Sequence, residues 1–206
     1  MKSKVIIITG GSFQGKSLIA LQVAAKLNIS NVISTDFVGI ILKTVFPNND
    51  SLTTSTYRLS PDKRNNQISL ISEHVKNVIE KYVERGEHLI VEGLHFSKEM
   101  INWSKINGFC CVFLDNQTSF ENRIILKHKT RTKLRLFKSD KSETYLDIIN
   151  PDNIDNSTYI QYANNINEIH SNLKDCAIDN DFRLVSFSDF NNGIMETYKY
   201  VNSFYK

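Results

Sequence analysis

The chain has 206 residues, of which 41% are hydrophobic and 23% charged, which is long enough for one well-cored α/β domain and short for two. Its apolar runs are only strand-sized, which argues against a membrane span and a signal peptide, so we expect an intracellular, cytoplasmic protein. The net charge of +3 is too small to indicate nucleic-acid binding by itself. The spacing of Cys110, Cys111 and Cys176 suits neither a zinc site nor a disulfide framework, so we expect core thiols.

Five short apolar runs, rich in β-branched and aromatic residues, alternate with helical patterns along the chain. They predict strands at residues 4–9, 31–34, 88–91, 109–114 and 183–187. This alternation is typical of a parallel sheet that is covered by helices on both faces. Ligands of such sheets gather outside the carboxyl ends of the strands. The residues just past each predicted strand are therefore the first candidates for chemistry.

A complete phosphate-binding loop follows the first predicted strand. Residues 10–17 read Gly-Gly-Ser-Phe-Gln-Gly-Lys-Ser, the G-x-x-x-x-G-K-S pattern, and a helical stretch follows at 18–27. The glycines permit a tight turn whose amide groups converge on phosphate oxygens at the positive end of that helix. Lys16 would place a positive charge on the β- and γ-phosphates, and Ser17 would offer its hydroxyl to Mg²⁺. The predicted contacts to a nucleoside triphosphate are Gly10, Gly11, Ser12, Phe13, Gln14, Gly15, Lys16, Ser17 and Leu18.

An acidic residue follows the second predicted strand. The sequence Ser-Thr-Asp-Phe at 34–37 would bring the carboxylate of Asp36 near the phosphate loop. Asp36 could accept the proton of an acceptor hydroxyl as a general base, or it could hold a water molecule bound to Mg²⁺. It could also serve as the N-cap of a helix over 37–45, a position that aspartate favours. Asp36 is therefore a candidate for catalysis, for acceptor binding and for metal binding.

A long amphipathic helix precedes the third predicted strand, and Gly86 is its predicted C-terminal cap. Its apolar face carries Ile68, Ile71, Val75, Val78, Ile79 and Tyr82. Directly past the strand, residues 92–95 read Glu-Gly-Leu-His. A carboxylate at the end of a buried strand is costly unless it meets a cation or hydrogen bonds, so we expect Glu92 to face the site. His95 is either a participant in the site or an ordinary surface or capping residue.

A run of lysine and arginine at 127–138 follows the fourth predicted strand. Cations that fold over the phosphates from a lid neutralise charge on the transferring group, which makes Arg123, Arg131 and Arg135 candidates for that role. The alternatives are a solvated helix face and a nucleic-acid contact, although few aromatic residues are interleaved. A second amphipathic helix precedes the fifth predicted strand, and it places Tyr162, Ile166, Ile169 and Leu173 on one side.

Several motifs occur in the order found in archaeal-type 2-phosphoglycerate kinases. They are the phosphate loop, Ser-Thr-Asp at 34–36, Ser-Thr-Tyr at 55–57, Val-Glu-Gly-Leu-His at 91–95 and Tyr-Leu at 145–146. The chain resembles these enzymes over nearly its whole length, within the P-loop kinases similar to shikimate, chloramphenicol and nucleoside monophosphate kinases. The resemblance implies the three-layer α/β fold of P-loop NTPases, with a five-stranded parallel sheet in the order 2-3-1-4-5 and helices on both faces. One domain over 1–206 would then carry an acceptor loop at about 47–66 and a lid at about 116–157.

The same resemblance implies ATP and Mg²⁺ as cofactors, and transfer of the γ-phosphoryl group to a hydroxyl of a small, anionic metabolite. It implies acceptor contacts at Asp36, Ser55, Tyr57, Glu92 and His95. The chain departs from the family pattern at 38–40, where an arginine that could hold an anionic group is missing, and Arg58 or Arg64 could take its place. Two alternatives stay open: another acceptor such as a nucleoside, nucleotide, sugar or antibiotic, and a polynucleotide-directed kinase or nucleotide-dependent nucleic-acid-binding protein.

Overall fold

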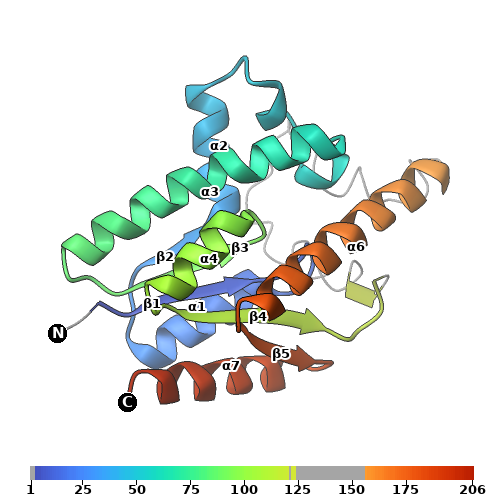
Figure 1. Cartoon of the computed structure of the whole chain (residues 1–206). Helices are drawn as coiled ribbons and strands as arrows, with labels where there is room; N and C mark the ends of the chain where they lie inside the picture. The colour runs from blue at the N-terminus through green and yellow to red at the C-terminus, as the bar shows by residue number, and fades with distance from the viewer. Residues whose placement is uncertain (1–2, 121, 124–155) are drawn as a thin grey trace, which may run out of the picture.

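The computed structural model describes residues 3–120, 122–123 and 156–206. In these residues the strands are β1 (Val5–Thr9), β2 (Val32–Ser34), β3 (Leu89–Gly93), β4 (Cys110–Asn116) and β5 (Arg183–Phe187). They form one sheet in the order β2-β3-β1-β4-β5, and every neighbouring pair is parallel (Figure 1). The α/β class, the five strands and their order are therefore confirmed.

The helices and short helical turns fall between these strands. They are α1 (Lys16–Leu27), α2 (Thr35–Val45), the 3₁₀ turns η1 (Asp50–Leu52) and η2 (Thr56–Arg58), α3 (Pro61–Glu84), α4 (Lys98–Ile106), α6 (Asn156–Asp179) and α7 (Phe190–Phe204). The predicted acceptor loop at 47–66 thus contains both 3₁₀ turns and the first turns of α3. Most of the predicted lid, 124–155, lies outside the described residues.

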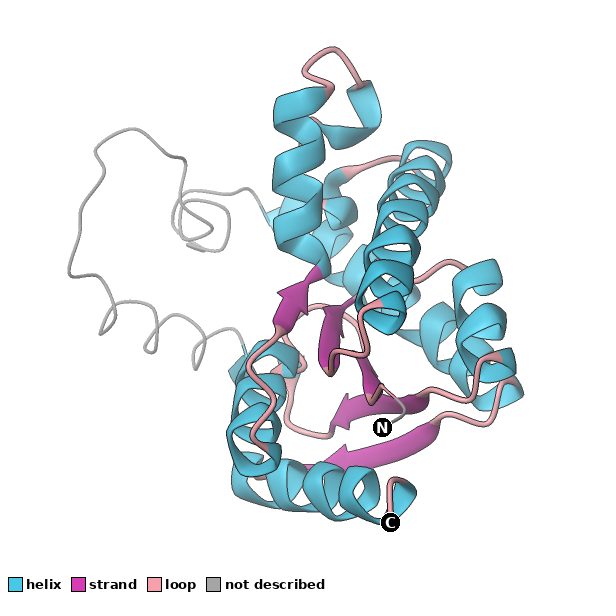
Figure 2. Ribbon diagram, turned by 90° about the vertical axis from the view of Figure 1, so that its left-hand side faces the viewer, coloured by secondary structure: helices cyan, strands magenta, loops and turns pink. Residues whose placement is uncertain are grey.

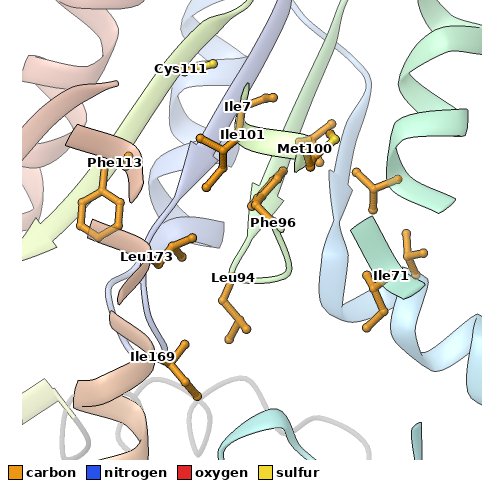
Figure 3. Close-up of a cluster of buried hydrophobic side chains, with 14 of the residues drawn as sticks. Ile7, Ile71, Leu94, Phe96, Met100, Ile101, Cys111, Phe113, Ile169 and Leu173 are labelled. Carbon is orange, nitrogen blue, oxygen red and sulfur yellow. The ribbon is translucent and has the colours of Figure 1, made fainter. Parts of the chain in front are cut away.

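Alternate residues of the strands point to opposite faces of the sheet and build two separate cores. Ile6 and Ile8 pack with apolar residues of α1 and α7. Val5 and Ile7 pack with residues of α3, α4 and α6, and Figure 3 shows the cluster around Ile7. The sheet therefore lies between two groups of helices, as Figures 1 and 2 show. Because both faces are covered, the inner strands β1, β3 and β4 are buried along their whole length and largely apolar, which is why they stood out in the sequence.

The two amphipathic helices are confirmed, although Ile68 and Val78 of the predicted apolar face of α3 are only partly buried. Helix α3 buries Ile71, Val75 and Ile79, and Gly86 follows its C-cap in a left-handed conformation with φ of 72°. Helix α6 buries Ile166, Ile169 and Leu173. Both helices cover the same face of the sheet, so the segment before β3 and the segment before β5 share one core. Among the described helices, none has the length and apolar character that crossing a lipid bilayer requires.

The cysteines also lie as predicted for core thiols. Cys110 and Cys111 are buried on opposite faces of β4 and Cys176 is half-buried, all three with free thiols. Burial raises the pKa of the Cys110 thiol to about 12, and it raises the pKa of Cys111 as well. These two thiols therefore stay protonated and unreactive at neutral pH.

Candidate active site

The phosphate loop joins β1 to α1 at the carboxyl edge of the sheet. Gly15, at the N-cap of α1, has a left-handed backbone with φ of 81°, and a Cβ there would overlap the ring of Phe190. Only glycine fits both constraints without strain. The loop thus leads into the positive end of a twelve-residue helix, where free amide groups attract anions. The residues present fit the phosphates of a nucleotide.

The other loop residues differ in exposure. Gln14 is 2% exposed, and its Oε1 accepts a hydrogen bond from the backbone amide of Asn116 at the end of β4, at 2.7 Å. Phe13 is largely buried and packs edge-on against Phe120, with ring centroids 5.8 Å apart. Ser12 and Leu18 are less buried, since Leu18 is 47% exposed in the first turn of α1. The loop is therefore held to the protein by Gln14 and Phe13.

Lys16 lies across the phosphate loop. Its Nζ donates a hydrogen bond to the carbonyl oxygen of Gly11 at 2.8 Å. Burial lowers the pKa of Lys16 below its ordinary value, while the negative charges of Glu92 and Asp36 act in the opposite direction. The ammonium group therefore sits in a desolvated place where a phosphate would be its strongest partner.

Nucleotide binding is expected to take up protons at alkaline pH, because the phosphate charge raises the lowered pKa of Lys16. At a pH between the pKa values of the free and bound protein, a neutral amine must gain a proton as the nucleotide binds. The measurement is titration calorimetry in two buffers of different ionisation enthalpy. The uptake should vanish in Lys16→Met, and proton release by the wild-type chain would contradict this account of Lys16.

Ser17 and Glu92 meet beside Lys16. The Oγ of Ser17 donates a hydrogen bond to Oε1 of Glu92 at 2.9 Å, and Glu92 is 4% exposed near the end of β3. The Glu92 carboxylate thus faces the phosphate loop. A hydroxyl and a carboxylate are oxygen ligands of the kind that Mg²⁺ binds. No cluster of three or more His, Cys, Asp or Glu that could hold a metal occurs in the described residues, so Mg²⁺ would need further oxygens from phosphates and water.

Asp36 lies in the first turn of α2 and is not its N-cap. The helix begins at Thr35, and Ser34, which has an extended backbone, occupies the N-cap position. The helix predicted over 37–45 is therefore present but begins two residues earlier, and the assignment of Asp36 as its N-cap is wrong because the chain becomes helical immediately after β2. The Asp36 side chain is 65% exposed, and its Oδ1 lies 3.5 Å from Nδ1 of His95. Its carboxylate is accessible to an acceptor.

His95 is buried and joins three segments of the site. Its Nδ1 lies 2.9 Å from Oγ1 of Thr35, and its Nε2 lies 2.8 Å from Oγ1 of Thr56. Thr56 in turn donates a hydrogen bond to Oε1 of Gln67 at 2.6 Å, so Thr56 accepts from Nε2 and the proton of a neutral ring is on that nitrogen. Since His95 is 4% exposed, it is not the surface residue that one interpretation allowed. It ties the start of α2 to η2.

The folding stability is expected to fall as the pH drops from about 6.5 to about 4, because burial lowers the pKa of His95 from 6.5 to about 4. In that window the unfolded chain binds a proton that the folded chain does not, so the folded state loses about 3 kcal/mol relative to the unfolded state. Urea unfolding at pH 7 and at pH 5 measures this. The pH dependence should be shallower in His95→Gln; an equal dependence in both proteins would contradict the assignment.

The predicted acceptor residues Ser55, Tyr57 and Arg58 lie at η2, which packs against α6. Ser55 is the N-cap residue of η2. Tyr57 is 4% exposed, its ring packs edge-on against Tyr162 at 5.6 Å, and its carbonyl oxygen accepts a hydrogen bond from Asn165 at 2.8 Å. The guanidinium of Arg58 lies 5.6 Å from the centre of the Tyr162 ring. This segment is therefore fixed by α6.

Arg64 and Arg123 are two further cations near these groups. Arg64 is 4% exposed on α3, and its Nη1 lies 3.1 Å from Oε2 of Glu168 on α6. Arg123 lies over the ring of Phe120, 5.7 Å from its centre, and Phe120 packs on the phosphate loop. Arg123 is thus linked to the phosphate loop through Phe120 and Phe13. Arg131 and Arg135 lie outside the described residues.

Sequence reasoning missed one group of residues. The backbone amide of Gly11 donates a hydrogen bond to Nδ1 of His170 on α6, at 3.1 Å. On the other side of the ring, Nε2 of His170 lies 3.2 Å from Oδ1 of Asp115. His170 occupies a position next to the apolar face of α6, and nothing in its local sequence distinguishes it from a surface histidine. It comes 159 residues after Gly11, so the folded structure alone brings them together.

No sequence profile of a known protein family matches the chain. It is 23% identical to the 2-phosphoglycerate kinase of Methanopyrus kandleri over 97% of this chain and 61% of that protein. It is 28% identical to the mevalonate-3-phosphate 5-kinase of Thermoplasma acidophilum over 66% of this chain and 76% of that protein. The 2-phosphoglycerate kinase of Methanocaldococcus jannaschii is 28% identical over 53% of this chain, which spans 40% of that relative's length.

Solved structures show the same fold. The shikimate kinase of Acinetobacter baumannii, solved with shikimate, superimposes with a TM-score of 0.54 at 10% identity, over 98% of this chain and 92% of that one. A protein from Thermus thermophilus superimposes with a TM-score of 0.53 at 13% identity, over 98% of both chains. The chain therefore has the three-layer P-loop fold found in shikimate kinase, and in sequence it is similar to 2-phosphoglycerate kinases.

Proposed function

We propose that this chain is an ATP- and Mg²⁺-dependent kinase that transfers the γ-phosphoryl group to a hydroxyl of a small, anionic metabolite. The observation that carries this proposal is the convergence of a phosphate-loop lysine with two carboxylates. Glu92 and Asp36 both act electrostatically on Lys16, although they come from different segments. Relatives named as kinases that act on 2-phosphoglycerate and mevalonate 3-phosphate support the reaction class.

Each group near the phosphate loop has a defined role in this proposal. ATP would supply the phosphoryl group, and Mg²⁺ would supply positive charge that offsets the negative charge of the phosphates. Lys16 and Arg123 stabilise negative charge on the transferring group, and this electrostatic effect is the largest contribution of a protein to such chemistry. Ser17 offers its hydroxyl to Mg²⁺, and Glu92 accepts a hydrogen bond from that hydroxyl. Arg131 would add a second cation from the predicted lid.

Asp36 orients the acceptor hydroxyl or accepts its proton. Its carboxylate is exposed, and His95 holds the start of α2 against β3 and η2 so that the carboxylate keeps its position. We assign His95 and Glu92 to the walls of the site, and Ser55 and Tyr57 to its acceptor side. A rigid support of this kind matters because phosphoryl transfer requires the attacking oxygen to lie in line with the leaving group.

Two arginines favour an anionic acceptor. The Nε atoms of Arg58 and Arg64 are buried and make no hydrogen bond within the part of the chain that the structure describes. The planar guanidinium group can bind a carboxylate or a phosphate through two parallel hydrogen bonds. The two kinases to which the chain is similar are named for phosphorylated acceptors. An acceptor with a phosphate or carboxylate group would satisfy these arginines.

The test is ATP consumption with Mg²⁺ against a panel of hydroxyl compounds. The panel contains 2-phosphoglycerate, 3-phosphoglycerate, glycerate, mevalonate 3-phosphate, nucleosides and a short oligonucleotide with a 5′-hydroxyl. Stimulation by one small anionic compound is the expected result. Stimulation by the oligonucleotide alone would contradict the proposal and favour a nucleic-acid-directed enzyme, whose binding should weaken steeply with salt in a gel-shift titration.

A further inference from the structure

Helix α6 contacts both sides of the proposed active site. Towards its N-terminus, Asn165 and Glu168 bind the acceptor side through Tyr57 and Arg64. Two residues after Glu168 it reaches the phosphate loop, where a Cβ added at Gly11 would lie 2.7 Å from Cβ of His170. A Cβ contact this short does not occur in folded proteins, so the loop and the helix touch only because residue 11 is glycine.

The hydrogen bonds of His170 define its protonation state. The backbone amide of Gly11 can only donate, so Nδ1 of His170, 3.1 Å away, must be an acceptor without a proton. The proton of the neutral ring is then on Nε2, which lies 3.2 Å from Oδ1 of Asp115. The other oxygen of Asp115 accepts a hydrogen bond from Lys174 at 2.6 Å. Asp115 therefore fixes both the orientation and the tautomer of the ring.

A second contact joins His170 to the same loop. Nε2 of Gln14 lies 3.3 Å from Nδ1 of His170, while Oε1 of Gln14 accepts from the amide of Asn116. The ring itself is tilted over Phe113, with centroids 5.1 Å apart. The side chains of His170 and Asp115 are 16% and 11% exposed, so these hydrogen bonds are largely shielded from water. Shielded polar contacts of this kind fix geometry, because an unmade bond is costly there.

We propose that His170, oriented by Asp115, is a positioning residue that holds the phosphate loop in its nucleotide-binding form through the acceptor nitrogen Nδ1. This inference rests on the proposed nucleotide-binding function. A protonated ring carries hydrogen on both nitrogens and repels the Gly11 amide, so protonation removes the anchor. The charged groups that act on the ring are Asp115 on β4, Lys174 on α6 and Arg123 after β4. Burial lowers the pKa of His170, so the ring is neutral and able to accept at neutral pH.

Two substitutions separate the nitrogens of the ring. In His170→Asn, the amide oxygen can take the place of Nδ1 and accept from Gly11. In His170→Gln, the amide nitrogen reaches the place of Nε2 and can donate to Asp115, but the loop loses its acceptor. The expected result, by titration calorimetry with ATP and Mg²⁺ and without acceptor, is about tenfold weaker ATP binding in His170→Gln and a change within about twofold in His170→Asn.

The pH dependence of ATP binding is the second readout. The affinity for ATP should fall towards acid pH more steeply in the wild-type chain than in His170→Asn, because only the wild-type chain has a ring at this position that gains a proton and loses its acceptor nitrogen. Protonation of ATP itself affects both proteins equally. Asp115→Asn removes a negative charge that raises the pKa of His170, so in that variant the decrease in ATP affinity at acid pH should occur at a lower pH. Circular dichroism checks that each variant is folded, and Asp115→Asn tests the inference even if His170→Gln does not fold.

Three results would overturn the inference. The first is equal ATP affinity in the wild-type chain and His170→Gln. The second is an equal loss in His170→Asn and His170→Gln, which would indicate packing of the ring and not its acceptor nitrogen. The third is a decrease in ATP affinity towards acid pH that is the same in the wild-type chain, His170→Asn and Asp115→Asn. A wild-type chain that binds no nucleotide would contradict the proposed function itself, so the two failures are distinguishable.

Discussion

Replacement of Lys16 by alanine is expected to lower the rate of phosphoryl transfer by about a hundredfold or more. Lys16 places its ammonium group over the phosphate loop, where it donates to the carbonyl of Gly11. In this desolvated position a positive charge stabilises the transferring group far more than it would in water. Its loss should reduce turnover and weaken ATP binding together.

Lys26→Ala is the matched control for Lys16→Ala. Lys26 lies in the last turn of the same helix, α1, is exposed and stacks on Tyr198 with its Nζ 5.7 Å from the ring centre. Its removal should leave turnover near the wild-type value. Turnover is measured with saturating ATP, and thermal unfolding verifies that both variants are folded. A folded Lys16→Ala protein with wild-type turnover would show that the site assignment is wrong.

Replacement of Asp36 by asparagine is expected to lower turnover by roughly a hundredfold to ten-thousandfold, while ATP affinity stays nearly unchanged. Asparagine keeps the size of the side chain but neither accepts a proton nor carries the charge. The Asp36 side chain is exposed and its carboxylate lies beside His95, while Lys16 and Glu92 stay in place, so we expect the substitution to leave the nucleotide site largely intact. Measuring ATP affinity and turnover on the same protein distinguishes an effect on nucleotide binding from an effect on phosphoryl transfer.

The structural role of Asp36 has its own control. An acidic residue in the first turn of a helix stabilises it by about 0.3–1 kcal/mol, and Asp62 occupies the same place on α3. Asp36→Asn and Asp62→Asn should therefore lower the melting temperature by similar amounts, but only Asp36→Asn should lose turnover. If Asp36→Asn merely melts earlier and turns over normally, its role is confined to the helix terminus.

The sheet could be predicted from the sequence because a parallel strand that is buried on both faces must be apolar throughout. Each of the five apolar runs became a strand, and the phosphate loop was recognisable from its glycine and lysine spacing. The strand order came from the resemblance to known kinases, since no local pattern determines which strands are neighbours. The start of α3 could have been located better, because Pro61 at its first turn is a common helix start.

The site was less predictable wherever distant segments meet. Glu92 at the end of β3 was expected to face the site, but its hydrogen bond to Ser17 spans 75 residues and has no local signal. The interaction of His95 with Thr56 and the interaction of His170 with Gly11 depend in the same way on how the helices pack. Local sequence patterns predict which elements form, and these long-range contacts arise only when the elements assemble.

We propose that this chain moves the γ-phosphoryl group of ATP to a small hydroxyl compound. Transfer of ³²P from γ-labelled ATP tests it most directly, with each compound of the acceptor panel, with and without Mg²⁺, for the wild-type chain and Lys16→Ala. We expect a labelled product that requires both Mg²⁺ and one small anionic acceptor, and that is reduced about a hundredfold or more in Lys16→Ala. Label found only in inorganic phosphate or only on the oligonucleotide would contradict it.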